Sequence, residues 1–576
     1  MKDKIALAMV VSLTLVLMGA GLHLVHAAPP MQDQPAIRMN LGMAVMVGIL
    51  YYLAMSPWFA DLGFAVLYRP LVAGTLVGIV MGRPLAGMLV GANINILYLG
   101  WISTGGSLPG DPGLAGYLGT ALALSGGLDA KQALALAAPL GLLGSLTWAL
   151  RMSTCSIFAH IADSYAARGN IRGVALANFV FPQPFLFVIH AVPVALATWL
   201  GSTAVAQALD WIAQNAGWVM QGLYVASGML SALGIALNLR FLFRGSLFPY
   251  FFIGFLVASL AGGEINLLLS AIIGMCVAFL HVLFTAGELE RVEAPAHVEA
   301  RRRAGLLSKA DVFKAWLLWL FFSHANYNWE RMQGTGFAHS MTPIIRKLYK
   351  TPEDIRAALT RHLVFFNTQP DIGGVVHGVI IAMEEERAMG ADISDDAINA
   401  VKTGLMGPMA GIGDTIQQGV VIPLSLAIGM DLALRGSFLG PVLFALLVAA
   451  FVWGVGWTVW YSGYRQGKAV VTNILQSGVL QRVMTGAGVL GNFVLGVLAV
   501  KFVKLSTPIK FVIGGTTFEL QSVLDSLLPN LLPLLLVLVI WWLLEKKKMA
   551  ATTVMVIVIA VAVLGSYPVF GEFGFF

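Results

Sequence analysis

The sequence predicts an α-helical polytopic membrane protein, built from two related inverted modules with broken or re-entrant helices and a small β-hairpin near the C-terminus. Composition is the first reason, because 58% of the 576 residues are hydrophobic and 11% are charged, whereas a soluble chain carries roughly 25% charged residues. The second reason is three apolar runs, at 5–25, 271–286 and 531–544, which are spans or parts of spans of the roughly 20 residues that cross a bilayer. The mean hydropathy of +0.82 agrees with both.

Three basic clusters predict how the chain is oriented in the membrane. Lys2 and Lys4, the arginines at 301–303 and the lysines at 546–548 all flank apolar segments. The positive-inside rule places such clusters in the cytoplasm, so the C-terminus is expected outside. The net charge of +6 includes no basic stripe on a soluble domain, and no nucleic-acid partner is predicted.

The first half is expected to be a membrane domain preceded by a targeting segment. Residues 1–40 combine a basic start, an apolar run and small residues, which fits either a cleaved signal peptide or an uncleaved signal anchor. Residues 41–287 are almost continuously hydrophobic, yet 71–101 contain six glycines and one proline. Irregular backbone at membrane depth persists only where protein or a wet cavity surrounds it, so broken helices are expected here.

A charge-rich segment at 288–312 divides the chain, and a second domain, 313–576, follows it. The segment is predicted to be a soluble cytoplasmic linker, with one long loop inside a single domain as the alternative. In the second domain, Thr351 is expected to cap a helix whose first residue is Pro352, and Ser394 is expected to cap the next helix.

The C-terminal region combines a hairpin with two further spans. Residues 506–520 alternate around Gly514 and Gly515, which predicts the β-hairpin. Spans at about 526–545 and 549–570 follow, on either side of the lysine triplet.

The stretch GLMGPMAGIGDTIQQG, residues 404–419, is a glycine-rich segment that contains one acid. It lacks the third glycine of a dinucleotide-binding loop and the GK[ST] of a P-loop, so a phosphate cradle is excluded. Pro408 removes a backbone donor and the glycines permit tight turns, which predicts a broken helix ending at Asp414. A second glycine-rich break ends in Asp111, and two related inverted modules would produce such a pair.

The substrate-binding candidates fall into three groups. Asp414 is the first, because an acid among membrane segments is functional by default; a helix cap is the structural alternative. Asn93, Asn95 and Asp111 are the second, since neutral amides with one carboxylate suit a polyhydroxylated, uncharged ligand; hydrogen bonding between helices is the alternative. The third group is expected to form a polar wall of the site or a docking face. Its binding candidates are Glu330, Gln333, Asn367 and Gln369.

Motifs for catalysis and metal binding are missing from the sequence. No histidine belongs to an HExxH pattern or has a carboxylate at ligand spacing. The sequence therefore predicts no catalytic residue, no metal site and no cofactor.

With these residues in view, the chain resembles the mannose/fructose/sorbose family of sugar phosphotransferase permeases. Over about 308–571 it is similar to the IID subunit, through NWERMQGTGFAHSMTPIIRKLY, RHLVFFNTQP and EEERAMGADISDDAINAVKTGLMGPMAGIGD. Over about 41–287 it resembles the IIC subunit, through RPLVAGTLVGIVMG, LGWISTGGSLPGDPGLAG and LFPYFFIGFLVASL. The family usually encodes these subunits separately, so the resemblance implies a fusion of IIC and IID through the charged linker.

The resemblance implies a multi-pass permease of the bacterial cytoplasmic (inner) membrane, in contact with lipid. In such systems IIC and IID form the channel as related inverted halves and assemble into trimers, here a homotrimer. Phosphoenolpyruvate is the ultimate phosphate donor, a IIA protein phosphorylates a histidine of a IIB protein, and IIB phosphorylates the incoming hexose or amino sugar. This chain is expected to bind and move the sugar without a phosphohistidine of its own.

The chain departs from the family's pattern at several positions, including the displaced Asp61 before the RP motif and Val364 in RHLVFFNT. Asn95 stands where Glu or Gln is usual, and Gln418 and Ile422 stand where an aromatic-Gly-Thr and an Arg-Pro are usual. These departures leave two alternatives on the same fold: a non-phosphorylating carrier of a small polar solute, and a membrane sensor or docking receptor.

Overall fold

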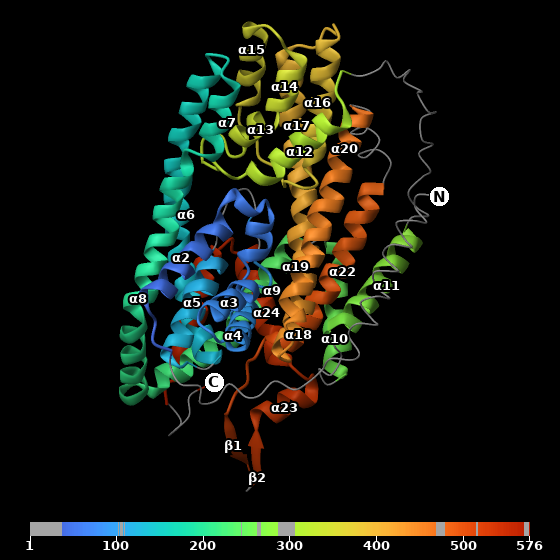
Figure 1. Ribbon diagram of the computed structural model, residues 1–576. Helices are drawn as coiled ribbons and strands as arrows, with labels where there is room; N and C mark the ends of the chain where they lie inside the picture. The colour runs from blue at the N-terminus through green and yellow to red at the C-terminus, as the bar shows by residue number, and fades with distance from the viewer. Residues whose placement is uncertain are drawn as a thin grey trace.

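The computed structural model describes most of the chain, over the ranges 37–101, 110–128, 130–242, 245–261, 267–285, 306–467, 479–513 and 516–568 and at residues 103, 108 and 575. The expected targeting segment before residue 37 and most of the expected linker lie outside the described residues. The described chain is very largely helical, as predicted, and Figure 1 shows long helices assembled into one bundle.

The first half folds into helices of very different lengths. They are α2 (Leu41–Met55), α3 (Pro70–Val80), α4 (Pro84–Leu97), α5 (Pro112–Gly126), α6 (Ala130–Ala166), α7 (Ile171–Phe179), α8 (Pro182–Asn215), α9 (Gly217–Leu242), α10 (Pro249–Leu260) and α11 (Leu267–Thr285).

The second half continues with shorter helices before its long ones. They are α12 (Lys309–Phe322), α13 (Gly334–Ser340), α14 (Thr342–Leu348), α15 (Pro352–His362), α16 (Gly374–Ala388), α17 (Asp395–Ile416), α18 (Ile422–Leu434), α19 (Leu439–Ala450), α20 (Gly456–Gln466), α22 (Val479–Phe502), α23 (Leu520–Leu527), α24 (Leu531–Glu545) and α25 (Ala551–Gly565).

Two short strands precede α23, in the segment where the sequence predicts a hairpin. β1 (Lys510–Ile513) pairs antiparallel with β2 (Thr516–Glu519), so that Lys510 lies opposite Glu519. The expected turn residues, Gly514 and Gly515, lie outside the described part of the chain.

Several helical segments are suited to crossing a membrane. Within the described ranges, four are long and apolar enough by length and composition: Ile171–Gly201, Asp395–Leu434, Leu439–Gln466 and Thr485–Phe502. A fifth results if α23 and α24, which are bent by 79°, count as one span. Shorter apolar helices, α2, α3, α4, α10 and α11 among them, accompany these spans.

The two helix starts predicted in the second half are confirmed. Thr351 Oγ1 accepts a hydrogen bond from the Asp354 backbone N at 3.1 Å, and Pro352 is the first residue of α15. Ser394 Oγ accepts one from the Ala397 backbone N at 3.1 Å at the start of α17. Each side chain satisfies one of the backbone donors that a helix start leaves free.

Interrupted helices are confirmed at 71–101, where α3 and α4 form a short helical hairpin. Gly82 makes the turn with φ of +73°, a conformation that favours glycine. A Cβ on Gly74 would lie 2.5 Å from the carbonyl oxygen of Gly87, so the two backbones meet where side chains are absent. The glycines of this segment therefore serve both the turn and close helix packing.

The prediction of a broken helix at 404–419 is wrong. α17 continues through Pro408 to Ile416, and a π-helical turn at Gln417–Val421 leads directly into α18. The low helix propensity of glycine is outweighed by packing, and Gly413 shows how: a Cβ there would lie 2.5 Å from Cβ of Gln369. The absent side chain allows close approach to a neighbouring segment rather than a chain break.

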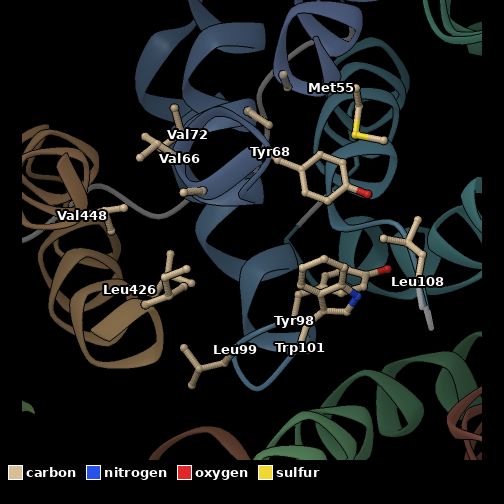
Figure 2. Packing of buried hydrophobic residues seen from close by; sticks show 14 of the residues in the cluster. Met55, Val66, Tyr68, Val72, Tyr98, Leu99, Trp101, Leu108, Leu426 and Val448 are labelled. Carbon is tan, nitrogen blue, oxygen red and sulfur yellow. The ribbon is translucent and has the colours of Figure 1, made fainter. Parts of the chain in front are cut away.

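The two halves are interleaved rather than separate. α18 contacts α4, α19 contacts α3, and α9 packs against both α24 and α25. Figure 2 shows part of this shared core, with Leu426 of α18 and Val448 of α19 facing the helical segments that carry Val66 and Val72. Burial of apolar surface across this junction, at about 25 cal/mol per Å², stabilises the pairing of the halves.

A buried ion pair holds the short helices together at the end of the bundle where α13 to α16 gather (Figure 1). The Arg361 guanidinium at the end of α15 donates to both carboxylate oxygens of Glu384 on α16, at 2.6 and 2.8 Å. The arginine also reaches Asp395, the first residue of α17, at 3.2 Å. The start of α17 is thus fixed to the helices beside it.

Candidate functional site

A cavity between the two halves, lined by apolar as well as polar and charged residues, contains four of the eight candidates. It is lined by Gln333, Asn367, Gln369 and Asp414, and its volume is about 110 Å³. The first half supplies the opposite side from the end of α2, the turns that follow it, and α6. Because both halves contribute, the cavity exists only when they are packed together.

Asp414 enters the cavity from the last turn of α17. Its Oδ1 accepts a hydrogen bond from Gln418 Nε2 at 2.7 Å. Gln418 in turn contacts the backbone of Ser103, accepting from its N at 2.9 Å and donating to its O at 3.2 Å. The amide thus links the acid of the second half to the first half.

The π-helical turn after α17 carries a second amide, Gln417, into a buried network. Gln417 Nε2 donates to Asp371 Oδ2 at 2.5 Å, and Gln369 Nε2 donates to the same oxygen at 3.0 Å. Gln369 Nε2 also donates to Gln417 Oε1 at 2.9 Å. One extra residue per turn brings Gln417 and Gln418 into these positions, and π-bulges are frequent at functional sites.

The segment between α12 and α13 forms another side of the cavity. Gln333 binds both backbone groups of Thr368, accepting from N and donating to O at 2.9 Å each, and its Nε2 lies 2.9 Å from His324 Nε2. Asn367 Oδ1 accepts from the Tyr327 hydroxyl at 2.9 Å. These bonds hold the two amides in place at the cavity.

The other four candidates lie outside this cavity. Asn95 is fully buried in α4 and accepts a hydrogen bond from the Leu71 backbone N at 3.1 Å, whereas Asn93 donates to Leu89 O of its own helix at 2.8 Å. Asn95 therefore makes the hydrogen bond between helices that was named as the alternative, whereas Asn93 bonds only within α4.

Asp111 and Glu330 also make structural contacts. Asp111 is buried, caps α5 by accepting from the Leu114 backbone N at 2.6 Å, and accepts from the Tyr51 hydroxyl at 2.5 Å. Glu330 is exposed and lies 3.0 Å from Nε2 of His160. Asn93, Asn95 and Asp111, the second group of candidates, therefore do not line the cavity that Gln333, Asn367, Gln369 and Asp414 share.

Three charged cavity residues were missing from the candidates: Asp61, Arg69 and Arg151. Arg151 links the halves, donating from Nη1 to Met55 O at 3.0 Å and from Nη2 to His324 O at 2.8 Å. The signal in the sequence was available, because each is a charge inside an apolar stretch, where ionisable residues mark functional positions.

The cavity can recognise a small polar solute by hydrogen bonds from several directions. Amides offer both donors and acceptors, and carboxylates offer acceptors. No group of three or more His, Cys, Asp or Glu suited to a metal ion occurs among the described residues. The fold and cavity thus define a class of protein, a helical membrane protein with a solute-sized polar cavity between its two halves.

Comparison with known proteins assigns the chain within that class. Residues 306–570 match the family described as "PTS system mannose/fructose/sorbose family IID component", and residues 41–280 match "PTS system sorbose-specific iic component". The chain belongs to the mannose/fructose/sorbose family of phosphotransferase permeases, with IIC and IID components joined in one polypeptide. The predicted family and its fusion are confirmed, and with them a sugar permease function.

Individual relatives divide between the two halves. The PTS system sorbose-specific EIID component of Klebsiella pneumoniae is 43% identical over 223 residues, 37% of this chain and 80% of that protein. The mannose-specific EIID component of Escherichia coli (strain K12) is 41% identical over 244 residues, 40% of this chain and 83% of that protein. The mannose-specific EIIC component of the same strain is 31% identical over 231 residues, 40% of this chain and 84% of that protein.

Proposed function

We propose that the cavity between the halves binds a hexose or amino sugar and presents it for phosphorylation by a separate IIB protein. The observation that carries this proposal is the convergence of Gln333, Asn367, Gln369 and Asp414 on one cavity. These side chains come from different segments of the second half, and the first half closes the other side. A polyhydroxylated ligand matches such a mixture of donors and acceptors.

The proposed chemistry leaves phosphoryl transfer to the partner protein. The phosphorus–nitrogen bond to the IIB histidine breaks, a phosphorus–oxygen bond to a sugar hydroxyl forms, and the hydroxyl proton passes to the freed imidazole. This chain would contribute orientation, because holding reactants in an attack geometry is itself a large part of catalysis. Asp414, with one oxygen held by Gln418, is proposed to accept a hydrogen bond from a sugar hydroxyl.

The wider organisation is part of the same proposal. Residues 41–287 would act as the IIC-like domain and 313–576 as the IID-like domain, joined by a cytoplasmic linker at 288–312. We propose that the two domains are related inverted modules and that the protein works as a lipid-embedded homotrimer in the bacterial inner membrane. The basic clusters at 301–303 and 546–548 support a cytoplasmic location of the linker and of the loop at 546–548, through the positive-inside rule.

The direct test is reconstitution of the full chain in proteoliposomes with a phosphorylated IIB protein encoded in the same genome. A panel of labelled hexoses, amino sugars and N-acetyl sugars is supplied, and sugar phosphate is measured on the IIB side. Formation of one or more sugar phosphates, dependent on both proteins, is the expected result. Uptake of free sugar without formation of sugar phosphate would show a non-phosphorylating carrier. The proposal would be overturned if the reconstituted chain produced no uptake and no sugar phosphate.

A further inference from the structure

Arg69 is a buried cation whose hydrogen-bonding capacity is largely unused. It precedes α3, lines the cavity and is 1% exposed. Neither Nε nor Nη1 has a hydrogen-bond partner in the structure. Buried polar groups are nearly always hydrogen-bonded, so two unsatisfied donors on one guanidinium beside a cavity point to a ligand that supplies the acceptors.

Nothing in the described part of the chain neutralises Arg69 at contact distance. No carboxylate there lies within 4.0 Å of its guanidinium nitrogens, and the buried Asp61 carboxylate of the same cavity acts on Arg69 only from a longer distance. The guanidinium lies 5.0 Å from the centre of the Trp101 ring, a cation–π contact. Such a contact offsets only part of the cost of burying an ion without an ion-pair partner.

Arg151 places a second cation beside the same cavity. Its two terminal nitrogens are used by backbone carbonyls of the two halves, while its buried Nε has no partner in the structure. Carbonyls supply dipoles but no charge, so in the described chain this arginine also has no carboxylate within 4.0 Å. Among the described residues the cavity therefore contains two buried guanidinium groups that have no carboxylate within 4.0 Å, together with the more distant carboxylates of Asp61 and Asp414.

We propose that the substrate is an acidic monosaccharide, an aldonic or uronic acid, whose carboxylate is bound by Arg69 with Arg151 adding to the positive field. The proposal rests on the sugar permease function proposed above and replaces the neutral hexose or amino sugar named there with an acidic sugar as the substrate. A guanidinium presents its donors in a planar fork that matches two carboxylate oxygens. The hydroxyl groups of the same molecule would face the amides of Gln333 and Gln369 and the carboxylate of Asp414.

Binding in detergent tests the charge preference before any transport is required. Titration of the purified full chain with gluconate, glucuronate, glucose and mannose, followed by tryptophan fluorescence and calorimetry, is expected to show at least tenfold tighter binding of an acid than of its neutral counterpart. Trp101 under Arg69 provides the fluorescent reporter. Equal or tighter binding of the neutral sugars would overturn the proposal.

Two variants assign the preference to the guanidinium. Arg69→Gln is expected to abolish the preference for the acid, and Arg69→Lys to retain part of it because the charge remains. Arg346→Gln, an exposed arginine on α14, is the matched control and should bind as the wild type does. If Arg69→Gln does not fold in a thermal melt, the wild-type comparison and Arg69→Lys still decide the outcome. An unchanged preference in a folded Arg69→Gln would contradict the assignment.

Phosphorylation by the IIB protein separates the two proposals. Phosphorylation of sugar acids over neutral sugars supports both. Phosphorylation of neutral sugars alone would overturn the acidic substrate while the permease function stands. Absence of phosphorylation with either class would remove both.

Discussion

Nε2 of Gln418 donates a hydrogen bond to Oδ1 of Asp414 at 2.7 Å, one helical turn earlier in the chain. The same amide is hydrogen-bonded to the backbone of Ser103, 315 residues away in the sequence. The cavity acid is therefore held by a residue from the segment where the sequence departs from its family's usual pattern. This arrangement makes the role of each group separately testable.

Asp414→Asn removes the charge but keeps an oxygen that can accept from Gln418. We expect sugar phosphorylation to fall at least tenfold, because a neutral amide is a weaker acceptor than a carboxylate for a sugar hydroxyl. Membrane assembly and melting temperature should stay close to wild type, since the acid is only partly buried. The measurement is the reconstituted phosphorylation assay, with Asp392→Asn, an exposed acid in a loop, as the control. Wild-type activity in Asp414→Asn would remove the acid from the site.

Gln418→Leu breaks the link between the halves at the cavity. We expect a higher KM and a modest loss of stability, about 1 kcal/mol, because both backbone groups of Ser103 and one oxygen of Asp414 lose a partner. Thr415→Ala is the matched control on the same helix, since Thr415 bonds only Gly411 O one turn earlier at 2.7 Å. An unchanged KM would show that positioning Asp414 does not require this amide.

Asn95→Ala is expected to reduce stability rather than alter sugar recognition. The side chain accepts from the Leu71 backbone N in the first turn of α3, and leaving a buried donor unsatisfied costs roughly 1–3 kcal/mol. Asn93→Ala is the comparison, because Asn93 bonds only within its own helix. Thermal melts in detergent compare the stabilities of the two variants, and Asn95→Ala is expected to melt at the lower temperature. An unchanged melting temperature of Asn95→Ala together with a changed order of sugar preference would contradict a structural role for Asn95.

Glu384→Gln is expected to be strongly destabilising. It leaves the Arg361 guanidinium buried without its bidentate partner, and removing one member of a buried pair costs about 3–5 kcal/mol. Asp395, which also contacts Arg361, will offset part of this destabilisation. Glu386→Gln, in the same helix but outside the pair, is the control. Equal melting temperatures for the two variants would show that the buried pair does not stabilise the fold.

Glu384 and the neighbouring His362 predict that the protein is less stable in acid. Burial lowers the pKa of the His362 imidazole to about 4, against the opposing effect of Glu384. Burial alone would raise the pKa of Glu384, but Arg361 and His362 outweigh it and hold that pKa well below its usual value.

Both groups therefore bind fewer protons in the folded state than in the unfolded state. Their contribution is fully present above the unfolded histidine pKa of about 6.5 and is lost as the pH falls toward 4 and below. We expect the melting temperature to fall by roughly 2 °C between pH 7 and pH 5, because about 2 kcal/mol is lost and a chain of this length shifts by about 1 °C per kcal/mol. A melting temperature that rises over this range would contradict the sign.

Much of the fold could be predicted because composition and local pattern determine it. Apolar runs identified the membrane class, and Thr351 and Ser394 marked helix starts through hydrogen bonds within three residues. Gly413 misled, because glycine has two uses that look alike in a sequence: chain reversal and close packing. Only the position of Gln369 against Gly413 shows which use applies.

The cavity could be predicted only in part because it is assembled from distant segments. Asp414 was predicted as an acid among membrane segments and Gln369 as part of a polar wall, and the structure brings them together with Gln333 and Asn367. The same reasoning placed Asn95 and Asp111 in the site, yet both satisfy backbone donors elsewhere. A polar residue in a membrane segment signals a hydrogen-bonding need, and only packing reveals whether a ligand or the protein meets it.

The most direct test of the proposed sugar site is a cryo-EM structure of the chain bound to a sugar that is phosphorylated in the reconstituted assay. We expect density for the sugar in the cavity between the halves, within hydrogen-bonding distance of Asp414 and the amides of Gln333 and Gln369. Sugar density elsewhere, with this cavity empty, would contradict the proposed site.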